Sequence, residues 1–239
     1  GFIDAHIHMP QTQVIASYGA QLMEWLNKYT FVEEQKLEQQ GHAEKLSRFL
    51  LDELLSSGTT TAAVYCSVHE KSAEAFFAES HRRNTRMIAG KVMMDRNAPP
   101  ALTDTAESGY AESKALIGRW HGKGRQLYAI TPRFAVTSSP EQMAASQRLV
   151  AEHPGCFVQT HINENRAEIA FARELYPEAA DYAGIYEDYG LLGQKSLLGH
   201  CIHMTKREWR AFAEHGAVAV FCPTSNLFLG SGLFDWERA

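Results

Sequence analysis

The sequence has few cysteines, and none of them is close to another. Cys66, Cys156, Cys201 and Cys222 lie far apart, and no Cys-x-x-Cys motif occurs. Each cysteine lies in or beside an apolar segment of strand character. This pattern favours buried free thiols in a reducing compartment, so we expect a cytoplasmic protein without disulfides.

Long apolar segments and basic clusters are also missing. No stretch approaches the roughly 20 apolar residues that a membrane-spanning helix needs. The formal net charge is −5, and the basic residues are scattered apart from the pair Arg82 and Arg83. Because a nucleic-acid-binding surface would be basic, the composition argues against nucleic acid and against a membrane as partners.

Motifs of several enzyme classes are absent as well. No Gly-x-Gly-x-x-Gly or Walker-type loop follows the first apolar segment, which argues against a nucleotide-binding Rossmann fold. No Gly-x-Ser-x-Gly elbow supports a serine nucleophile. The combined His-x-Glu and Pro-Cys-x-x-Cys signature of cytidine-deaminase-type zinc enzymes is missing. Hydrolysis by a metal-bound water is the chemistry that remains.

Seven short segments with the apolar, β-branched character of strands alternate with amphipathic helical segments. The expected strands are the segment that ends before Pro10 and residues 59–66, 87–93, 127–133, 156–162, 196–201 and 217–222. Helices are expected around residues 18–29, 46–55, 72–77, 110–120, 139–155, 169–175 and 205–216.

This alternation predicts a parallel α/β fold, and a TIM-like (β/α)8 barrel fits better than an open sheet. Such a barrel holds its active site at the carboxyl ends of the strands, where the polar residues of this sequence gather. One strand is missing from a complete barrel, and the sequence begins with Gly1 instead of Met. We therefore expect residues 1–239 to be a partial barrel domain of a metal-dependent hydrolase, cut from a longer protein.

Four histidines close expected strands. His6 and His8 end the first strand, where side chains two residues apart point the same way. His161 ends the fifth strand, and His200 ends the sixth. An isolated His-x-His pair is more often structural, but four histidines at the same topological position predict one metal site. Imidazole ligands suit both zinc and iron.

Two strand ends carry further candidates. Glu164 follows His161 and suits a proton carrier that reaches both a metal-bound water and the substrate. The alternative for Glu164 is an acidic residue stabilised by the dipole of the next helix. Arg133 can hold a carbonyl oxygen or an anion, with Phe134 as a stacking wall, unless it forms an ordinary surface ion pair.

The first eight residues resemble the first-strand motif of the amidohydrolase superfamily, and the rest of the chain resembles its guanine deaminase family. The narrowest matches are Trp25-Leu26-Asn27-Lys28-Tyr29 and Lys91-Val92-Met93-Met94-Asp95-Arg96-Asn97. Further matches are Met9-Pro10-Gln11, Thr131-Pro132-Arg133-Phe134, Thr160-His161-Ile162-Asn163-Glu164-Asn165, Gly199-His200-Cys201 and Phe221-Cys222-Pro223-Thr224-Ser225-Asn226.

The resemblance implies hydrolytic deamination of guanine to xanthine and ammonia by a water bound to a single zinc ion, with iron as the other possible metal. It implies that His6, His8 and His161 ligate the metal. His200 is then a further ligand or a hydrogen-bond partner of the attacking water. Glu164 is expected to carry protons to the ring and to the leaving amine. A homodimer is expected from the same resemblance.

The resemblance also implies how the purine is bound. Gln11, Arg133 and Phe134 would contact it, with Arg133 on its carbonyl oxygen. The remaining substrate contacts are expected from His8, His161 and Glu164.

The family pattern continues beyond what this sequence contains. Its eighth strand, the aspartate on that strand and the small β-sandwich that flanks the barrel are absent here. Asp235 follows the seventh strand and does not take the place of that aspartate. We therefore expect the 239-residue chain alone to be inactive or poorly folded.

Two alternatives remain at this point. The chain could be another amidohydrolase deaminase or dechlorinase, acting on a related purine, pyrimidine or triazine ring. It could also be a non-catalytic scaffold that kept the barrel. The intact set of four histidines and Glu164 argues against a scaffold, which has no need of polar residues around one cavity.

Overall fold

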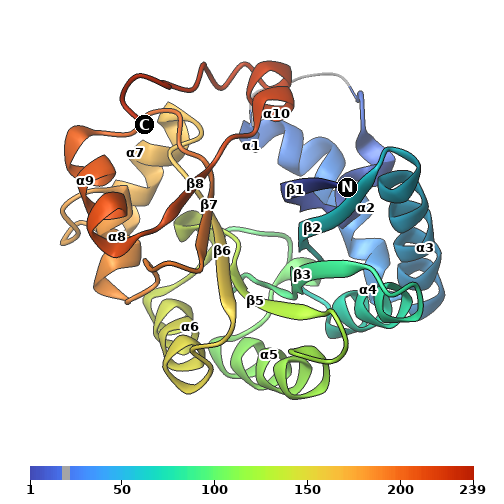
Figure 1. Ribbon diagram of the computed structural model, residues 1–239. Helices are drawn as coiled ribbons and strands as arrows, with labels where there is room; N and C mark the ends of the chain where they lie inside the picture. Colours follow the sequence, from blue (N-terminus) through green and yellow to red (C-terminus); the bar gives the residue numbers. More distant parts are fainter. Residues whose placement is uncertain (18–21) are drawn as a thin grey trace.

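Parallel strands form a curved sheet that closes most of the way into a barrel (Figure 1). The computed structural model describes residues 1–17 and 22–239. Its strands are β1 (Phe2–His8), β2 (Thr59–Tyr65), β3 (Arg86–Gly90), β4 (Val92–Met93), β5 (Leu127–Pro132), β6 (Phe157–Ile162), β7 (Ser196–His200) and β8 (Val218–Val220). They pair in the order β1-β2-β3-β5-β6-β7-β8, and β4 pairs with β5. In the described part of the chain, β1 and β8 do not pair, so the sheet stays open between them.

Helices surround the sheet on the outside (Figure 1). They are α1 (Leu22–Trp25), α2 (Phe31–Glu34), α3 (Gln40–Ser56), α4 (Glu70–Arg82), α5 (Ala106–Trp120), α6 (Pro140–Glu152), α7 (Arg166–Leu175), α8 (Tyr182–Asp188), α9 (Lys206–His215) and α10 (Pro223–Phe228). The predicted alternation and the TIM-like barrel are confirmed. Among the described residues, no helix combines the length and the apolar character needed to cross a membrane.

The expected strand 87–93 is interrupted. Gly90 lies so close to β5 that an added Cβ would meet the carbonyl oxygen of Ala129 at 1.9 Å, which leaves room for glycine alone. The next residue, Lys91, is fully buried, and its Nζ lies 2.6 Å from Oδ2 of Asp104. A close backbone contact and a buried ion pair therefore split the strand, and neither is visible in the apolar pattern.

The connection between β1 and β2 is helical but changes its winding several times. Tyr18, the first residue of the helix expected here, lies outside the described residues. Beyond α1 the chain forms a π-helical turn (Leu26–Thr30), α2 and a 3-10 turn (Gln35–Glu38). The connection buries apolar side chains such as Phe31 and Leu37.

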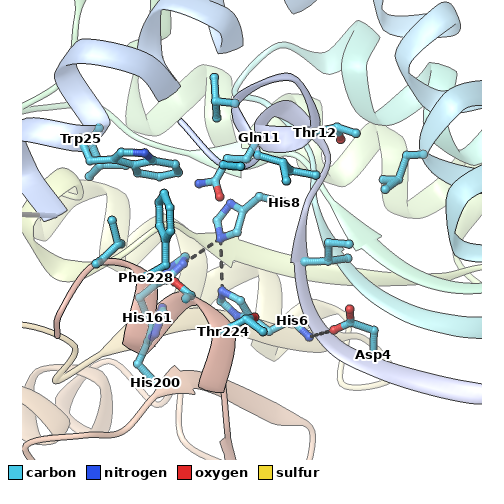
Figure 2. Close-up of a pocket in the computed structure, with 18 of the residues that line it drawn as sticks. Asp4, His6, His8, Gln11, Thr12, Trp25, His161, His200, Thr224 and Phe228 are labelled. Carbon is cyan, nitrogen blue, oxygen red and sulfur yellow. Dashed lines mark hydrogen bonds between the residues drawn. The ribbon is translucent and has the colours of Figure 1, made fainter. Parts of the chain in front are cut away.

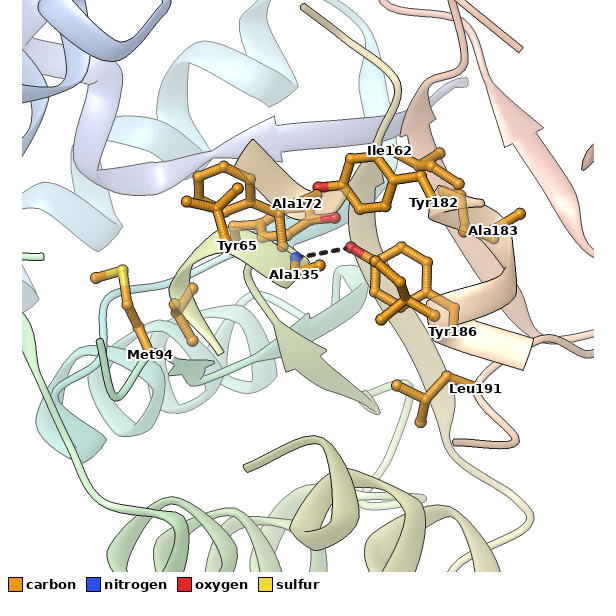
Figure 3. Close-up of a cluster of buried hydrophobic side chains, with 14 of the residues drawn as sticks. Tyr65, Met94, Ala135, Ile162, Ala172, Tyr182, Ala183, Tyr186 and Leu191 are labelled. Atoms are coloured by element: carbon orange, nitrogen blue, oxygen red, sulfur yellow. Dashed lines mark hydrogen bonds between the residues drawn. The ribbon is translucent and has the colours of Figure 1, made fainter. Parts of the chain in front are cut away.

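The short helix α8 was not expected from the sequence, but it carries a buried tyrosine that ties two strand ends together (Figure 3). Tyr186 accepts a hydrogen bond from the backbone N–H of Ala135 (3.0 Å) and donates one to the carbonyl oxygen of His161 (2.8 Å). One hydroxyl thus joins the segment after β5 to the end of β6. Both segments carry candidate site residues.

We predict that Tyr186→Phe lowers the free energy of unfolding by about 1–3 kcal/mol, because a buried N–H and a buried carbonyl lose their partner. Urea unfolding measures the change. Tyr189→Phe is the matched control, since Tyr189 is only half-buried, and it should change stability by less than about 0.5 kcal/mol. Equal stability of the Tyr186→Phe variant and the wild type would contradict this role of the hydroxyl.

Candidate active site

A cavity of about 760 Å³ includes the carboxyl ends of several strands and extends along β1 to helix α3 and the start of β2 (Figure 2). Its lining includes every side chain that the sequence marked as a candidate. These residues are His6, His8, Gln11, Arg133, Phe134, His161, Glu164 and His200. The structure therefore brings all of them together, from strand ends that are far apart in the sequence.

Four imidazole rings meet at this cavity (Figure 2). Nε2 of His8 lies 3.2 Å from Nε2 of His6 and 2.9 Å from Nε2 of His161. One ligand atom each from His6, His161 and His200 lie within 4.8 Å of one another. In a tetrahedral zinc site with Zn–N distances of about 2.0–2.1 Å, the ligand nitrogens lie about 3.3–3.5 Å apart. The group whose ligand atoms can hold one ion consists of His6, His161 and His200, and Nε2 of His8 lies closer to its two neighbours than this spacing.

In two of the rings, the nitrogen that faces away from the histidine cluster forms a hydrogen bond that fixes the tautomer. Nδ1 of His161 lies 2.6 Å from the carbonyl oxygen of Arg133, and Nδ1 of His200 lies 2.8 Å from Oδ1 of Asn226. Both partners are acceptors, so Nδ1 carries the proton and Nε2 keeps its lone pair.

The electrostatics of the cluster favour a cation. Burial is the main cause that lowers the pKa of all four imidazoles, so the rings stay neutral near pH 7. Neutral rings offer lone pairs as metal ligands, and in His161 and His200 the lone pair is on Nε2, which faces the cluster. A divalent metal ion supplies the missing positive charge, and oriented neutral imidazoles are its usual protein ligands.

Close packing sets the positions of His6 and His8. A Cβ at Gly199 would lie 2.6 Å from Cε1 of His6, so β7 needs a glycine where it passes this ring. Tyr65 stacks on His8, with ring centroids 4.4 Å apart and planes inclined by 16°. The sequence analysis missed both supports, because a glycine and an aromatic residue in a strand are ordinary features.

The backbone is strained where β7 ends. His200 and Cys201 have φ values of 76° and 50°, a region that residues other than glycine seldom occupy. Such conformations persist where the surrounding structure fixes them, and they are common at functional sites. With this backbone conformation, the His200 ring contacts Asn226 and Glu164.

Glu164 is buried beside the histidines and lies before α7, not in its first turn. Its Oε2 lies 3.3 Å from Nε2 of His200. Burial raises the pKa of Glu164 to about 8. The carboxyl group therefore keeps a proton near neutral pH, as a proton donor requires, and this favours the catalytic interpretation over the helix-dipole one.

Glu168 holds the backbone next to Glu164. Its Oε2 accepts hydrogen bonds from the backbone N–H groups of Glu164 (3.0 Å) and Asn165 (2.9 Å), and Tyr182 donates to its Oε1 (2.7 Å). Burial first, and the neighbouring Glu164 second, raise the pKa of Glu168 to about 7. The sequence analysis missed Glu168, although Asn165 and Glu168 have the spacing of a capping box.

The rim of the cavity offers flat apolar surfaces. The Phe134 ring centroid lies 6.3 Å from that of His161. Trp25 and Phe228 meet edge to face with centroids 6.3 Å apart, and Gln11 lies close to them in the same cavity (Figure 2). Trp25 and Phe228 were not singled out as site residues, because aromatic residues at helical spacing usually belong to a core.

Arg133 forms an ion pair inside the protein and not at the surface. Its side chain is 3% exposed, and Nη1 donates to Oε2 of Glu34 at 2.8 Å. Among the described residues, Nη2 of Arg133 has no hydrogen-bond partner. Arg133 also lines the cavity, so its side chain can meet a ligand there. Glu34 was missed because it lies on α2, far from Arg133 in the sequence.

A model of the amidohydrolase family matches residues 1–239. The chain belongs to the amidohydrolase family. This membership agrees with the barrel and with the histidine cluster at the carboxyl ends of its strands. Amidohydrolases generally bind a divalent metal, and His6, His161 and His200 are grouped closely enough to hold one.

Individual proteins with similar sequences or structures are named guanine deaminase. This amidohydrolase is 53% identical to the guanine deaminase of Escherichia coli (strain K12) over 239 residues, which are 100% of this chain and 54% of that protein. The solved structure of E. coli guanine deaminase superposes with a TM-score of 0.99 and 53% identity, covering 100% of this chain and 55% of that one. The guanine deaminase of C. acetobutylicum, solved with bound guanine, has a TM-score of 0.92 and 31% identity, covering 97% and 56%.

The chain spans about half the length of the curated relatives it matches. What those proteins do as a whole is therefore carried to this chain only as a proposal.

Asn226→Ala is expected to weaken binding of zinc by about 10–100-fold, because His200 loses the acceptor that orients its ring. Competition with a chromogenic chelator measures the affinity. Asn226→Asp keeps an acceptor and should lose much less. A zinc affinity of the Asn226→Ala variant within twofold of wild type would show that the contact does not support the metal site.

The buried carboxyl group of Glu168 makes stability depend on pH. Its pKa in the folded chain is about 7, above the ordinary value of 4.5. The stabilisation is therefore complete below pH 4.5 and is lost as the pH rises through 7. We expect the free energy of unfolding of the metal-free protein to fall over this range.

Glu168→Gln stays neutral at every pH, so it should flatten this dependence, although it costs stability through a lost hydrogen bond. Urea unfolding at a series of pH values measures the slope. Glu174→Gln, on the exposed face of the same helix, is the control and should keep the wild-type slope. An unchanged slope in Glu168→Gln would rule out this carboxyl group as the cause.

Proposed function

We propose that this amidohydrolase chain forms the catalytic barrel of a guanine deaminase, which converts guanine and water to xanthine and ammonia. The observation that carries the proposal is a single cavity with four neutral histidines, a buried carboxyl group that keeps its proton, and an arginine with an unpaired N–H. Relatives that are named guanine deaminase support guanine as the substrate.

Zinc is the metal that we propose for this site. His6, His8 and His161 would hold it, and His200 would be a further ligand or the partner of the attacking water. When bound, zinc is a Lewis acid that lowers the pKa of a coordinated water to about 7. Iron suits the same ligands. The aspartate that the family pattern carries on a further strand, after the one labelled β8 here, stays a prediction.

Glu164 supplies the protons in this proposal. Attack on the ring carbon that bears the amino group leaves negative charge on the neighbouring ring nitrogen unless a proton arrives there. Glu164 holds a proton near neutral pH, and its Oε2 lies beside His200. It donates this proton to the ring nitrogen, takes one proton from the water and passes it to the amino group, which leaves as ammonia. It then takes the second proton of the water as the new carbonyl group forms, so the carboxyl group is protonated again.

The purine is held by residues around the cavity. The Arg133 guanidinium donates to the carbonyl oxygen of guanine, and the side-chain amide of Gln11 bonds to the ring edge. Phe134 packs against the ring. His8 and His161 complete the contacts on the side of the metal.

Two further expectations belong to the whole protein. We propose a homodimer, from the family resemblance of the sequence. A cytoplasmic location is supported by four buried cysteines that are all free thiols.

The test uses the zinc-loaded protein that contains this chain. Guanine should be deaminated, whereas adenine should be a poor substrate, because adenine has no carbonyl oxygen for Arg133. Turnover of cytosine and ammeline is compared in the same assay. Preferred turnover of ammeline or adenine would instead establish the alternative, a deaminase of a related ring. Lack of turnover together with lack of stoichiometric zinc would establish a scaffold.

Glu164→Gln should lower kcat for guanine by about 100- to 10,000-fold, since the amide cannot transfer protons, with a smaller change in KM. Steady-state kinetics at neutral pH measure both values. Glu174→Gln, exposed and remote from the cavity, is the control. A kcat within a few-fold of wild type would remove Glu164 from the mechanism.

A further inference from the structure

The ion pair between Glu34 and Arg133 is buried but incomplete. Their side chains are 1% and 3% exposed, and they share one hydrogen bond, from Nη1 to Oε2 (2.8 Å). Among the described residues, Oε1 of Glu34 and Nη2 of Arg133 have no hydrogen-bond partner. A pair that served stability alone would gain from the bidentate geometry that arginine and carboxylate favour. Leaving two buried polar atoms unmatched is costly, which points to a functional reason.

Two residues of helix α2 contact the guanidinium group of Arg133. Phe31 and Glu34 are three residues apart, so they lie on the same face of the helix. The Arg133 guanidinium lies over the Phe31 ring, with its carbon 5.4 Å from the ring centroid. An aromatic face and a carboxylate therefore fix the plane and one edge of the guanidinium.

The backbone of Arg133 is fixed just as firmly. Its N–H donates to the carbonyl oxygen of Met93 (3.2 Å), and its carbonyl oxygen accepts from the N–H of His161 (3.1 Å) as well as from the ring Nδ1 of His161 (2.6 Å). The same residue thus orients a candidate metal ligand through its main chain and lines the cavity through its side chain. A guanidinium held at both ends keeps Nη2 in one place relative to the histidine cluster.

The charge of the pair decides what Nη2 can bind. A lone buried arginine carries a full positive charge and favours carboxylate or phosphate groups. With Glu34 beside it, the pair is neutral as a whole, and a second negative charge would face the carboxylate at short range. A neutral carbonyl oxygen meets the unpaired N–H without that repulsion.

We propose that Glu34 is a positioning residue that makes Arg133 select neutral ring carbonyl groups over anionic ligands. The inference rests on the proposed function, because it explains how that cavity recognises a neutral lactam such as guanine. It also assigns a role to the helical segment over the barrel: α2 takes part in substrate selection.

The experiment compares two purines that are not substrates. Hypoxanthine is a neutral ring with a carbonyl group, and urate is an anion at neutral pH. Their dissociation constants are measured by calorimetry on the zinc-loaded protein that contains this chain, for the wild type and for Glu34→Gln. The wild type should prefer hypoxanthine, and Glu34→Gln should shift the ratio of the two constants towards urate by about tenfold or more.

Two further variants separate charge from structure. Glu34→Asp keeps the charge and should keep the wild-type preference, even if both ligands bind more weakly. Glu33→Gln, on the same helix and paired with Lys36, should leave the ratio unchanged. If Glu34→Gln does not fold, the Asp variant decides: loss of the preference there would overturn the inference, and its retention would support it.

Unchanged selectivity in a folded Glu34→Gln protein overturns the proposal, and so does a wild type that binds urate as well as hypoxanthine. These outcomes are distinct from a failure of the proposed function. A wild type that prefers hypoxanthine but does not deaminate guanine would leave the role of Glu34 intact and refute the deaminase assignment.

Discussion

The structure depends on one constraint: four imidazoles, of which His161 and His200 are buried and His6 and His8 half-buried, crowd together in one cavity and stay neutral. Burial lowers the pKa of each ring, so protonation does not relieve the crowding. The outer nitrogens of His161 and His200 are bound to oxygen acceptors, so rotation of those rings is opposed as well. The barrel holds this arrangement in place through β1, β6 and β7. A bound cation would satisfy the ring nitrogens that face the centre, which links the fold to metal chemistry.

The same constraint explains why the supports of the site are polar and buried. The carbonyl oxygen of Arg133 orients His161, and the Tyr186 hydroxyl binds the carbonyl oxygen of His161. Glu168 fixes the backbone at Glu164 in a similar way. Each of these contacts satisfies a group that would otherwise be buried without a partner. Loss of one support therefore displaces a site residue and destabilises the chain at the same time.

Periodicity and strand ends were sufficient to predict the barrel and seven of the candidate residues that line the cavity, because parallel strands of a barrel bring their carboxyl ends together whatever the loops do. Gln11 was predicted from the family resemblance alone. The supports could not be predicted in this way. Glu34, Asn226 and Tyr65 reach the site through the path of a connection or through packing against a ring. Glu34 in particular follows a segment whose winding changes from α to π, and a regular helical pattern assigns it no definite direction. Contacts that depend on such irregular segments have no short-range signal in the sequence.

In the proposed function, the position of Arg133 couples recognition of the purine to catalysis. The main-chain carbonyl oxygen of Arg133 fixes the ring of His161, a candidate metal ligand. Its guanidinium, held by Glu34 and Phe31, belongs to the proposed substrate contacts. A shift of the segment after β5 would move both at once. The distance between the ring carbonyl and the attacked carbon of a bound purine is set by covalent bonds, so the protein must match it with a rigid element. A single residue that carries both contacts meets this requirement more directly than two residues on separate loops.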